Sequence, residues 1–313
     1  MHLLLPFAAA SSEGGAQAID SLRLPQLQRL LPLLAPADHL QIGDTALSLP
    51  HERVLALHRG WEPVDGGLPF AAWAAQADGL PVADAAQGWG LLTPAHWQVG
   101  AEQIVLLDPA QLQLGEDESR RLWQALQPLF ESEGWALHWG APSRWYLVHP
   151  SLTGLRSAAV ERVVGEAIDR WLPDRRSAAM LRRLQSEAQM LLHTHPLNAE
   201  REARGALVVN SFWLSGTGRT QSLQPVADEP LVDERLRAPW LAGDWSAWRE
   251  AWHALDAQRL PELVQRAQRG EAVSLTLCGE RNAQRYDSVP LNTWQKLLRR
   301  WRSSDPLPLL ETL

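Results

Sequence analysis

The chain has 313 residues, 45% of them hydrophobic, and a formal net charge of −7. This length suggests two domains, or one core with an insertion, and the hydrophobic content is ample for a buried core. Non-specific nucleic-acid binding needs a basic stripe, and the sequence has no basic block of five or more residues. No apolar run reaches the roughly 18 residues of a membrane span. We therefore expect neither a nucleic-acid partner nor a membrane partner.

Cysteine usage and the start of the chain bear on the cellular compartment. Cys278 is the single cysteine, which excludes an intrachain disulfide and a cysteine-based zinc cluster. The apolar start, Met1–Ala10, lacks a basic segment and is broken by Pro6. We interpret it as a first buried strand rather than a signal peptide. The expected location is the cytoplasm.

Predicted strands alternate with predicted helices, which is typical of the α/β class. Strands are expected over residues 3–7, 89–92, 96–107 (bent near Gly100), 135–139, 144–148, 208–214 and 273–278. Helices are expected over residues 16–34 (in short pieces), 49–59, 68–77, 116–130, 177–193, 244–257, 261–268 and 291–301. Ser48, Ser177 and Asp244 are expected at or near helix N-caps.

Tryptophan is unusually frequent, with 16 residues. Trp245, Trp248 and Trp252 recur at helical spacing, so they mark one face of a helix. Core packing is the simplest interpretation of that face, and a partner or ligand surface is the alternative.

The most distinctive segment runs from His195 to Gly218 and reads H-P-x-N-x-x-R-x-x-x-G, then N-x-x-W-x-S-G-x-G. Asn and Arg side chains donate hydrogen bonds, and glycine lets backbone N–H groups approach a ligand closely, so the set suits an anionic ligand. The predicted ligand-binding residues are His195, Asn198, Arg201, Asn210, Ser215, Gly216 and Gly218. For Asn198 and Arg201 the alternative is helix capping with a surface ion pair to Glu200 or Glu202.

Other site chemistries find little support in this segment. His193 and His195 could bind one metal together only if the helix has ended, as Pro196 favours, and no third ligand stands at a suitable spacing. Gly216-x-Gly218 follows a predicted strand, but no Gly-Lys-Ser/Thr is present, which argues against a nucleotide P-loop. We predict no catalytic residue, no metal and no cofactor.

The same motif resembles the return segment of archaeal-type, cofactor-independent phosphoglycerate mutases of the alkaline-phosphatase superfamily. The runs 185–192 and 210–216 also look like the RpfE-type bacterial regulatory proteins, and Gly60-Trp61-Glu62-Pro63 resembles the mutases' Gly-Tyr-Asp-Pro. The resemblance implies an α/β fold with an alkaline-phosphatase-like core, residues 1–95 and 206–313. It also implies a smaller inserted α+β domain, residues 96–205.

The sequence departs from the family pattern at the positions that would carry the nucleophile and the metal ligands. The resemblance implies a Ser or Thr nucleophile and two divalent metals, which clamp the attacking and leaving oxygens. Here Pro6-Phe7 stands in place of Asp-Gly, and Gly279-Glu280-Arg281 in place of Gly-Asp-His. Counting back from Gly60 without gaps places His51 and Glu52 at the nucleophile and its neighbour. The implied protein is catalytically degenerate and binds a phosphorylated small molecule or a protein partner.

Two alternatives stay open. One is an active phosphoglycerate mutase or phosphohydrolase with atypical metal ligands, drawn from Asp44, His51, Glu52, His58, Glu280 and Asp287. The other is an interaction module that uses exposed tryptophans as anchors, because tryptophan is favoured at interface hot spots.

Overall fold

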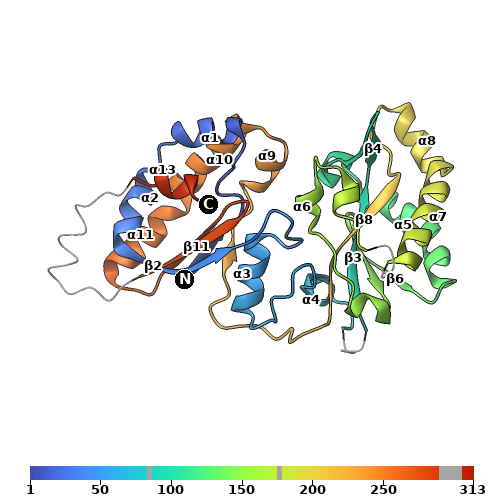
Figure 1. The fold of residues 1–313 in the computed structure, drawn as a ribbon, viewed down its shortest axis with the longest axis horizontal. Coiled ribbons are helices and arrows are strands. Elements are labelled where there is room, and N and C mark those ends of the chain that lie inside the picture. The colour runs from blue at the N-terminus through green and yellow to red at the C-terminus, as the bar shows by residue number, and fades with distance from the viewer. Residues whose placement is uncertain (83–86, 175–177, 289–304) are drawn as a thin grey trace. The chain divides into compact units, whose positions relative to one another are not determined.

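The computed structural model describes residues 1–82, 87–174, 178–288 and 305–313, which fold into two compact units. Unit 1 is formed by Met1–Thr45, Leu49–Arg59 and Pro225–Leu313. Unit 2 is formed by Ala46–Ser48 and Gly60–Gln224. Each unit has its own sheet with helices packed on it (Figure 1).

Unit 1 contains a five-stranded mixed sheet in the order β2-β11-β10-β1-β9. Its strands are β1 (His2–Leu5), β2 (Leu34–Gln41), β9 (Leu231–Val232), β10 (Ser274–Cys278) and β11 (Asn282–Ser288). β1 lies parallel to β9 and β10, whereas β11 is antiparallel to β10 and β2. Central parallel strands are buried on both faces, and Leu3, Leu4 and Leu5 are each 0% exposed.

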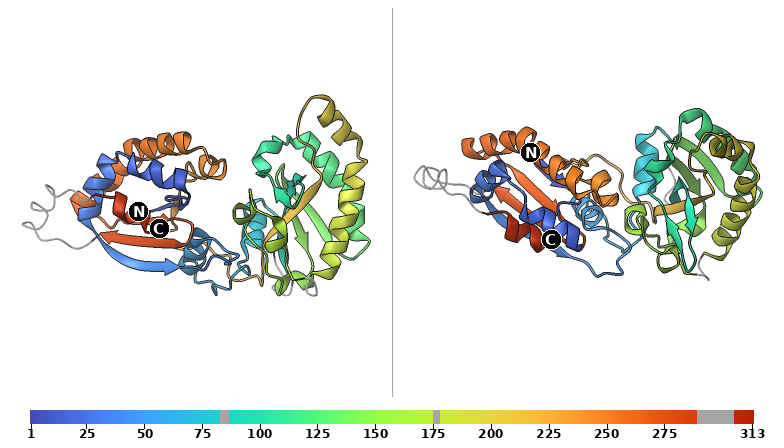
Figure 2. Two further views of the ribbon diagram at one scale, coloured as in Figure 1. Left: turned by 45° about the horizontal axis from the view of Figure 1, so that its top comes forward. Right: turned by 90° about the horizontal axis from the view of Figure 1, so that it is seen from above.

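Helices cover both faces of this sheet. They are α1 (Glu13–Asp20), α2 (Pro25–Leu30), the 3₁₀ turn η1 (Leu31–Leu33), α3 (Pro50–His58), α9 (Arg237–Leu241), α10 (Trp245–Gln258), α11 (Leu260–Arg269) and α13 (Leu307–Glu311). Figure 2 shows α1 and α2 (blue) with α10 and α11 (orange) on one side of the sheet. α3 contacts β2 and β11 on the face that carries Leu4 and Ala283.

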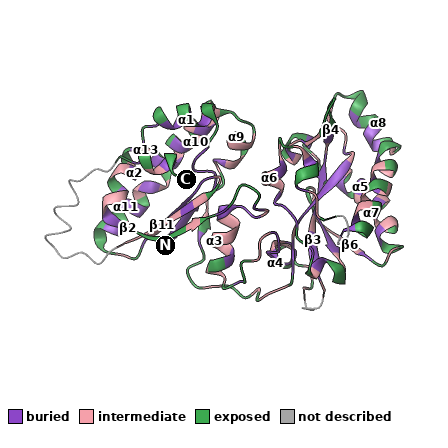
Figure 3. Ribbon diagram, viewed as in Figure 1, coloured by how far each residue is buried: buried purple, intermediate pink, exposed green. Residues whose placement is uncertain are grey.

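Unit 2 contains a four-stranded antiparallel sheet in the order β6-β7-β3-β8, and a separate hairpin of β4 and β5. The strands are β3 (Trp89–Ala95), β4 (Trp97–Val99), β5 (Ile104–Leu106), β6 (Ala136–Ala141), β7 (Arg144–Val148) and β8 (Ser211–Gly218). Side chains alternate across the sheet, so Phe212 and Leu214 enter one apolar cluster while Trp213 enters another. β8 is buried along almost its whole length (Figure 3).

The helices of unit 2 pack on both sides of its sheet. They are α4 (Phe70–Ala77), α5 (Glu116–Glu131), α6 (Val160–Val163), α7 (Ala179–His193) and α8 (Pro196–Ala203), with the 3₁₀ turns η2 (Pro109–Leu112), η3 (Pro150–Thr153) and η4 (Ile168–Arg170). Leu122 of α5 and Leu184 of α7 belong to the main apolar cluster of the unit. The alanines of α4 pack on the other side, against Trp89 and Tyr146.

The α/β prediction is confirmed, and most predicted elements occur within a few residues of their expected bounds. The predicted bent strand over residues 96–107 is wrong, because the chain reverses after Gly100 and forms the β4–β5 hairpin. The N-cap of α3 is Leu49, and the Ser48 hydroxyl instead accepts a hydrogen bond from the Gly66 N–H at 2.8 Å. The Ser177 cap and the helix expected over 291–301 lie outside the described residues.

The inserted unit takes in more of the chain than the predicted span of 96–205. Residues 60–95 and 206–224 belong to it as well, because β3 pairs directly with both β8 and β7.

Among the helices in the described ranges, none is both long enough and apolar enough to cross a bilayer.

Candidate functional site

The first candidate site is the edge of the unit 1 sheet beyond the carboxyl ends of β1 and β10. In open α/β sheets, ligands bind at this kind of edge. After Leu5 the chain turns through Phe7, and residues 6–10 are all buried. The Ala8 N–H donates to the Cys278 carbonyl at 2.8 Å. The segment that follows β1 is therefore fixed to the end of the neighbouring strand β10.

Three indoles close this edge. Each donates its N–H to a backbone carbonyl of the segment after β1: Trp248 to Phe7 at 3.0 Å, Trp252 to Ala8 at 3.3 Å and Trp240 to Ala9 at 3.0 Å. Trp248 and Trp252 are 0% exposed. Their burial confirms core packing as the interpretation of the tryptophan stripe at these positions.

Phe7 has an unusual backbone at this edge. It stands where the family resemblance expects a glycine, and its φ of 57° is one that glycine adopts easily. A bulky residue in this region costs about 1–3 kcal/mol. Its ring contacts His51 and Trp240, with centroid distances of 5.3 and 5.2 Å. His51, the position that gap-free counting gives to the nucleophile, thus packs against an aromatic ring.

The residues that follow β10 also bond to other parts of unit 1. Glu280 accepts hydrogen bonds from the Ser11 N–H at 2.8 Å and the Ser11 hydroxyl at 2.7 Å. Arg281 pairs with Asp44 at 2.8 Å. Leu313 lies so close to Gly279 that a Cβ on the glycine would meet its carbonyl carbon at 2.5 Å. Gly279, Glu280 and Arg281 therefore hold neighbouring segments of unit 1 together.

Two more of the metal ligands considered from the sequence, Glu52 and Asp287, have partners of their own. The Glu52 carboxylate accepts from the Leu49 N–H at 2.8 Å, and Asp287 accepts from Arg285 Nε at 2.9 Å. Within the described ranges, no group of three or more His, Cys, Asp or Glu side chains is arranged to hold a metal ion.

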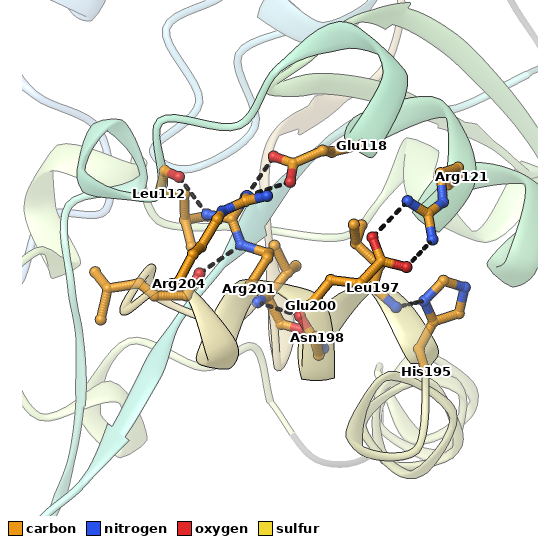
Figure 4. Close-up of polar contacts among 11 residues, drawn as sticks. Leu112, Glu118, Arg121, His195, Leu197, Asn198, Glu200, Arg201 and Arg204 are labelled. Carbon is orange, nitrogen blue, oxygen red and sulfur yellow. Dashed lines mark hydrogen bonds and ion pairs between the residues drawn. The ribbon is translucent and has the colours of Figure 1, made fainter.

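The second candidate site is the His195–Gly218 motif, which lies wholly in unit 2. Figure 4 shows the polar contacts of His195, Asn198 and Arg201. Asn198 is 5% exposed. Its amide group donates to the Leu192 and Val209 carbonyls, both at 2.8 Å, and its oxygen accepts from the Val209 N–H at 3.0 Å. Asn198 therefore joins the end of α7, helix α8 and the approach to β8.

Arg201 is buried at 1% exposure and bonds to three residues. Its guanidinium donates to the Leu207 carbonyl at 2.6 Å, to the Leu112 carbonyl and to the Glu118 carboxylate. Arg204 shares Glu118 from the surface. Burial raises the pKa of Glu118, but the hydrogen bond from Arg204 and the charge of Arg201 hold it below its ordinary value overall. Arg201 thus pairs with Glu118, whereas the sequence suggested Glu200 or Glu202.

His195 and Asn210 also bond to the backbone. His195 caps α8, and its Nδ1 accepts from the Leu197 N–H at 3.2 Å. Burial lowers the pKa of His195, and the Arg121 guanidinium lowers it further, which favours the neutral ring that this acceptor role needs. Asn210 accepts from the Trp97 N–H at 2.7 Å and donates to the Trp97 carbonyl at 2.9 Å.

Ser215, Gly216 and Gly218 belong to β8. Ser215 is buried, and both glycines have positive φ, 62° and 142°. A Cβ on Gly216 would lie 2.9 Å from the Ala71 nitrogen, and one on Gly218 would lie 2.3 Å from the Gly67 oxygen. The glycines therefore allow α4 and the loop before it to approach β8 closely.

Gly218 also lines a cavity of about 360 Å³ within unit 2. The other lining residues are Glu62, Val64, Gly67, Thr153, Gly154, Leu155, Arg156, Arg219 and Gln221. Arg156 and Arg219 are exposed and give the cavity two guanidinium groups against one carboxylate, that of Glu62. Sequence reasoning missed both arginines, because isolated arginines in loops carry no periodic or motif signal.

Of the predicted ligand-binding set, the structure brings Gly218 to this cavity. It engages Asn198, Arg201 and Asn210 with backbone groups elsewhere in unit 2. Ligand binding by the set as a whole stays a prediction.

Comparison with known proteins gives structural similarity alone. No family model and no curated protein matches the chain. A cofactor-independent phosphoglycerate mutase from Thermoplasma acidophilum DSM 1728 is similar at TM-score 0.40 and 16% identity, over 99% of this chain and 98% of the mutase. The PH0037 protein from Pyrococcus horikoshii is similar at TM-score 0.48 and 12% identity, over 98% of this chain and 91% of that protein. Both likenesses concern the fold.

Proposed function

We propose that this chain is a binding protein that holds a small phosphorylated anion and does not transfer its phosphate. One observation carries the proposal: the carboxyl edge of the unit 1 sheet is closed by buried indoles. Trp248 and Trp252 are 0% exposed, and their indole N–H groups donate hydrogen bonds to the backbone carbonyls that follow β1. Phosphate transfer with two metals would need this edge to be open and lined with carboxylates and imidazoles.

We infer that the anion binds in the unit 2 cavity beside Gly218. Arg156 and Arg219 both line it, and guanidinium groups bind phosphate through paired, charge-assisted hydrogen bonds. Gly67 and Gly218 also line it, and a glycine has no side chain that would block a ligand from its backbone N–H group. Glu62 on the rim opposes the anion, so the two arginines are both needed for net attraction.

Binding is tested by calorimetric titration of the wild type and variants with 3-phosphoglycerate. We expect Arg156→Ala and Arg219→Ala each to weaken binding by about 10-fold or more, because each removes a charged hydrogen-bond donor. Arg120→Ala, another exposed arginine of unit 2, is the matched control and should bind like the wild type. Equal affinity in all four proteins, or no heat at millimolar ligand, would contradict the proposal.

The absence of turnover needs a separate measurement. A coupled mutase assay with added manganese, together with elemental analysis, should give no activity above buffer. Turnover that accompanies stoichiometric bound metal would favour the active-enzyme alternative instead. The tryptophan interaction module has less support, because every tryptophan in the described ranges is buried or only partly exposed.

A further inference from the structure

A second cavity, of about 340 Å³, lies inside unit 1, between α3 and the sheet. This volume falls within the usual range of small-molecule sites, about 300–1,000 Å³. The sheet provides one wall through His2, Thr276, Ala283 and Arg285, and α3 provides the other through Val54, Leu57 and His58. It is distinct from the edge closed by the indoles, because His2 stands at the amino end of β1.

The walls of this cavity are largely apolar. Val54, Leu57 and His58 are spaced at i, i+3 and i+4, so they share one face of α3. Opposite them lie Leu40 and Ala283, which pack in one apolar cluster with Val54. A guest in this space would exchange water for aliphatic side chains, which favours an apolar body.

One buried polar atom at this wall is unsatisfied. Nε2 of His58 has no hydrogen-bond partner among residues 1–82, 87–174, 178–288 and 305–313. A buried donor or acceptor that is left unpaired destabilises the fold, because it has given up its hydrogen bonds to water. The neighbouring ring, His2, is already used: its Nε2 bonds to the Thr276 hydroxyl at 2.8 Å, and its centroid lies 5.8 Å from that of His58.

The charged groups around the cavity are already balanced. Arg285 donates to Asp287 at 2.9 Å and pairs with Asp38 at 3.5 Å. Burial lowers the pKa of His2 to about 4, with Arg285 adding to the effect, so this ring is neutral near pH 7. A charged guest would lose hydration between apolar walls and would find its counter-ion already paired.

We propose that this cavity binds an uncharged, largely apolar small molecule whose hydroxyl or amide group hydrogen-bonds to Nε2 of His58. The proposal is independent of the anion site of unit 2. It gives the buried imidazole nitrogen a partner, and it requires no change in the ion pairs of Arg285.

Three probes of similar size separate the chemical classes: phenol, toluene and benzoate. Each is titrated into the full chain while the histidine ring signals are followed by ¹H–¹⁵N NMR. We expect phenol to shift the His58 and His2 signals saturably and to bind about 3- to 10-fold more tightly than toluene, because of one added hydrogen bond. Benzoate should leave both rings unshifted. No response to phenol at 10 mM, or equal binding of benzoate, would overturn the proposal.

Two variants locate the site. His58→Phe keeps a ring of similar shape but removes Nε2, so phenol and toluene should then bind equally. Val54→Phe fills the cavity and should block both probes while the His58 ring remains. Met190→Ala, on an exposed residue of α7 in unit 2, is the control and should change neither affinity. Unchanged phenol binding in Val54→Phe would also overturn the proposal, even if His58→Phe fails to fold.

Discussion

The strand-end edge of unit 1 and the α7–α8–β8 junction of unit 2 are both buried, but they are stabilised by different chemistry. At the edge of unit 1, large indole rings fill the space and each uses one N–H to satisfy a carbonyl. At the junction in unit 2, an amide and a guanidinium are buried and bond to several backbone groups and one carboxylate. The comparison teaches two things. Polar residues that resemble a ligand site in the sequence, such as those of the unit 2 junction, can stabilise the fold. A sheet edge at which ligands often bind, such as that of unit 1, can be filled by side chains of the protein itself.

The largest effect is expected from Arg201→Met. Removing one partner of a buried ion pair costs about 3–5 kcal/mol in the free energy of unfolding, because the charge of the other partner, here Glu118, is left without its counter-charge. Urea unfolding should report this loss in the free energy of unfolding. Arg204→Met removes the other partner of Glu118, but its side chain is 51% exposed, so the loss should be about 0–1 kcal/mol. Equal losses in the two variants would break the distinction between the buried and exposed pairs.

Trp248→Phe tests the other side of the comparison. The ring is retained, but the Phe7 carbonyl loses its donor in a buried site, which should cost about 1–3 kcal/mol in the free energy of unfolding. Trp245→Phe, on the same helix and only half-buried, should cost less than about 1 kcal/mol. If both variants unfold at the same urea concentration, the indole N–H at position 248 does not stabilise the edge.

The pH dependence of stability should reflect Glu118. Its pKa is lower in the folded protein than its ordinary value of 4.5. A lowered carboxyl pKa adds stability that is fully present above the unfolded pKa and is lost as the pH falls through the folded pKa. The wild type should therefore lose stability on acidification below about pH 4.5 more steeply than Glu118→Gln. Parallel curves for the two proteins between pH 6 and pH 3 would contradict this assignment.

The smallest effect concerns the backbone at Phe7. Phe7→Gly and Phe7→Ala both lose the contacts with His51 and Trp240, but only glycine adopts a positive φ without strain. We expect the glycine variant to be more stable than the alanine variant by about 1 kcal/mol, measured by thermal unfolding. A more stable alanine variant would show that the turn after β1 relaxes to an ordinary conformation.

Local patterns in the sequence predicted much of the fold. The run of leucines after His2 predicted β1, and Asp244 was expected as the N-cap of α10, where its carboxylate accepts from the Ala247 N–H at 2.9 Å. Both depend on neighbours within a few residues. The helical spacing of Trp248 and Trp252 likewise predicted a buried face.

Contacts between distant segments could not be predicted in the same way. Arg201 pairs with Glu118, 83 residues away, so the sequence offered only the nearer Glu200 and Glu202 as partners. The two arginines of the unit 2 cavity come from separate loops that only the folded chain brings together. The motif of residues 195–218 carries side-chain donors that could bind an anion. In the folded chain Asn198 and Asn210 bond to backbone groups instead, and the positions of those groups depend on tertiary packing.

The most direct test of the closed edge is an NMR measurement on the indole N–H signals with and without Mn²⁺. Our account predicts that the signals of Trp240, Trp248 and Trp252 exchange slowly with solvent and keep their line widths at millimolar Mn²⁺. Selective broadening of these three signals, together with phosphate transfer from 3-phosphoglycerate under the same conditions, would contradict it.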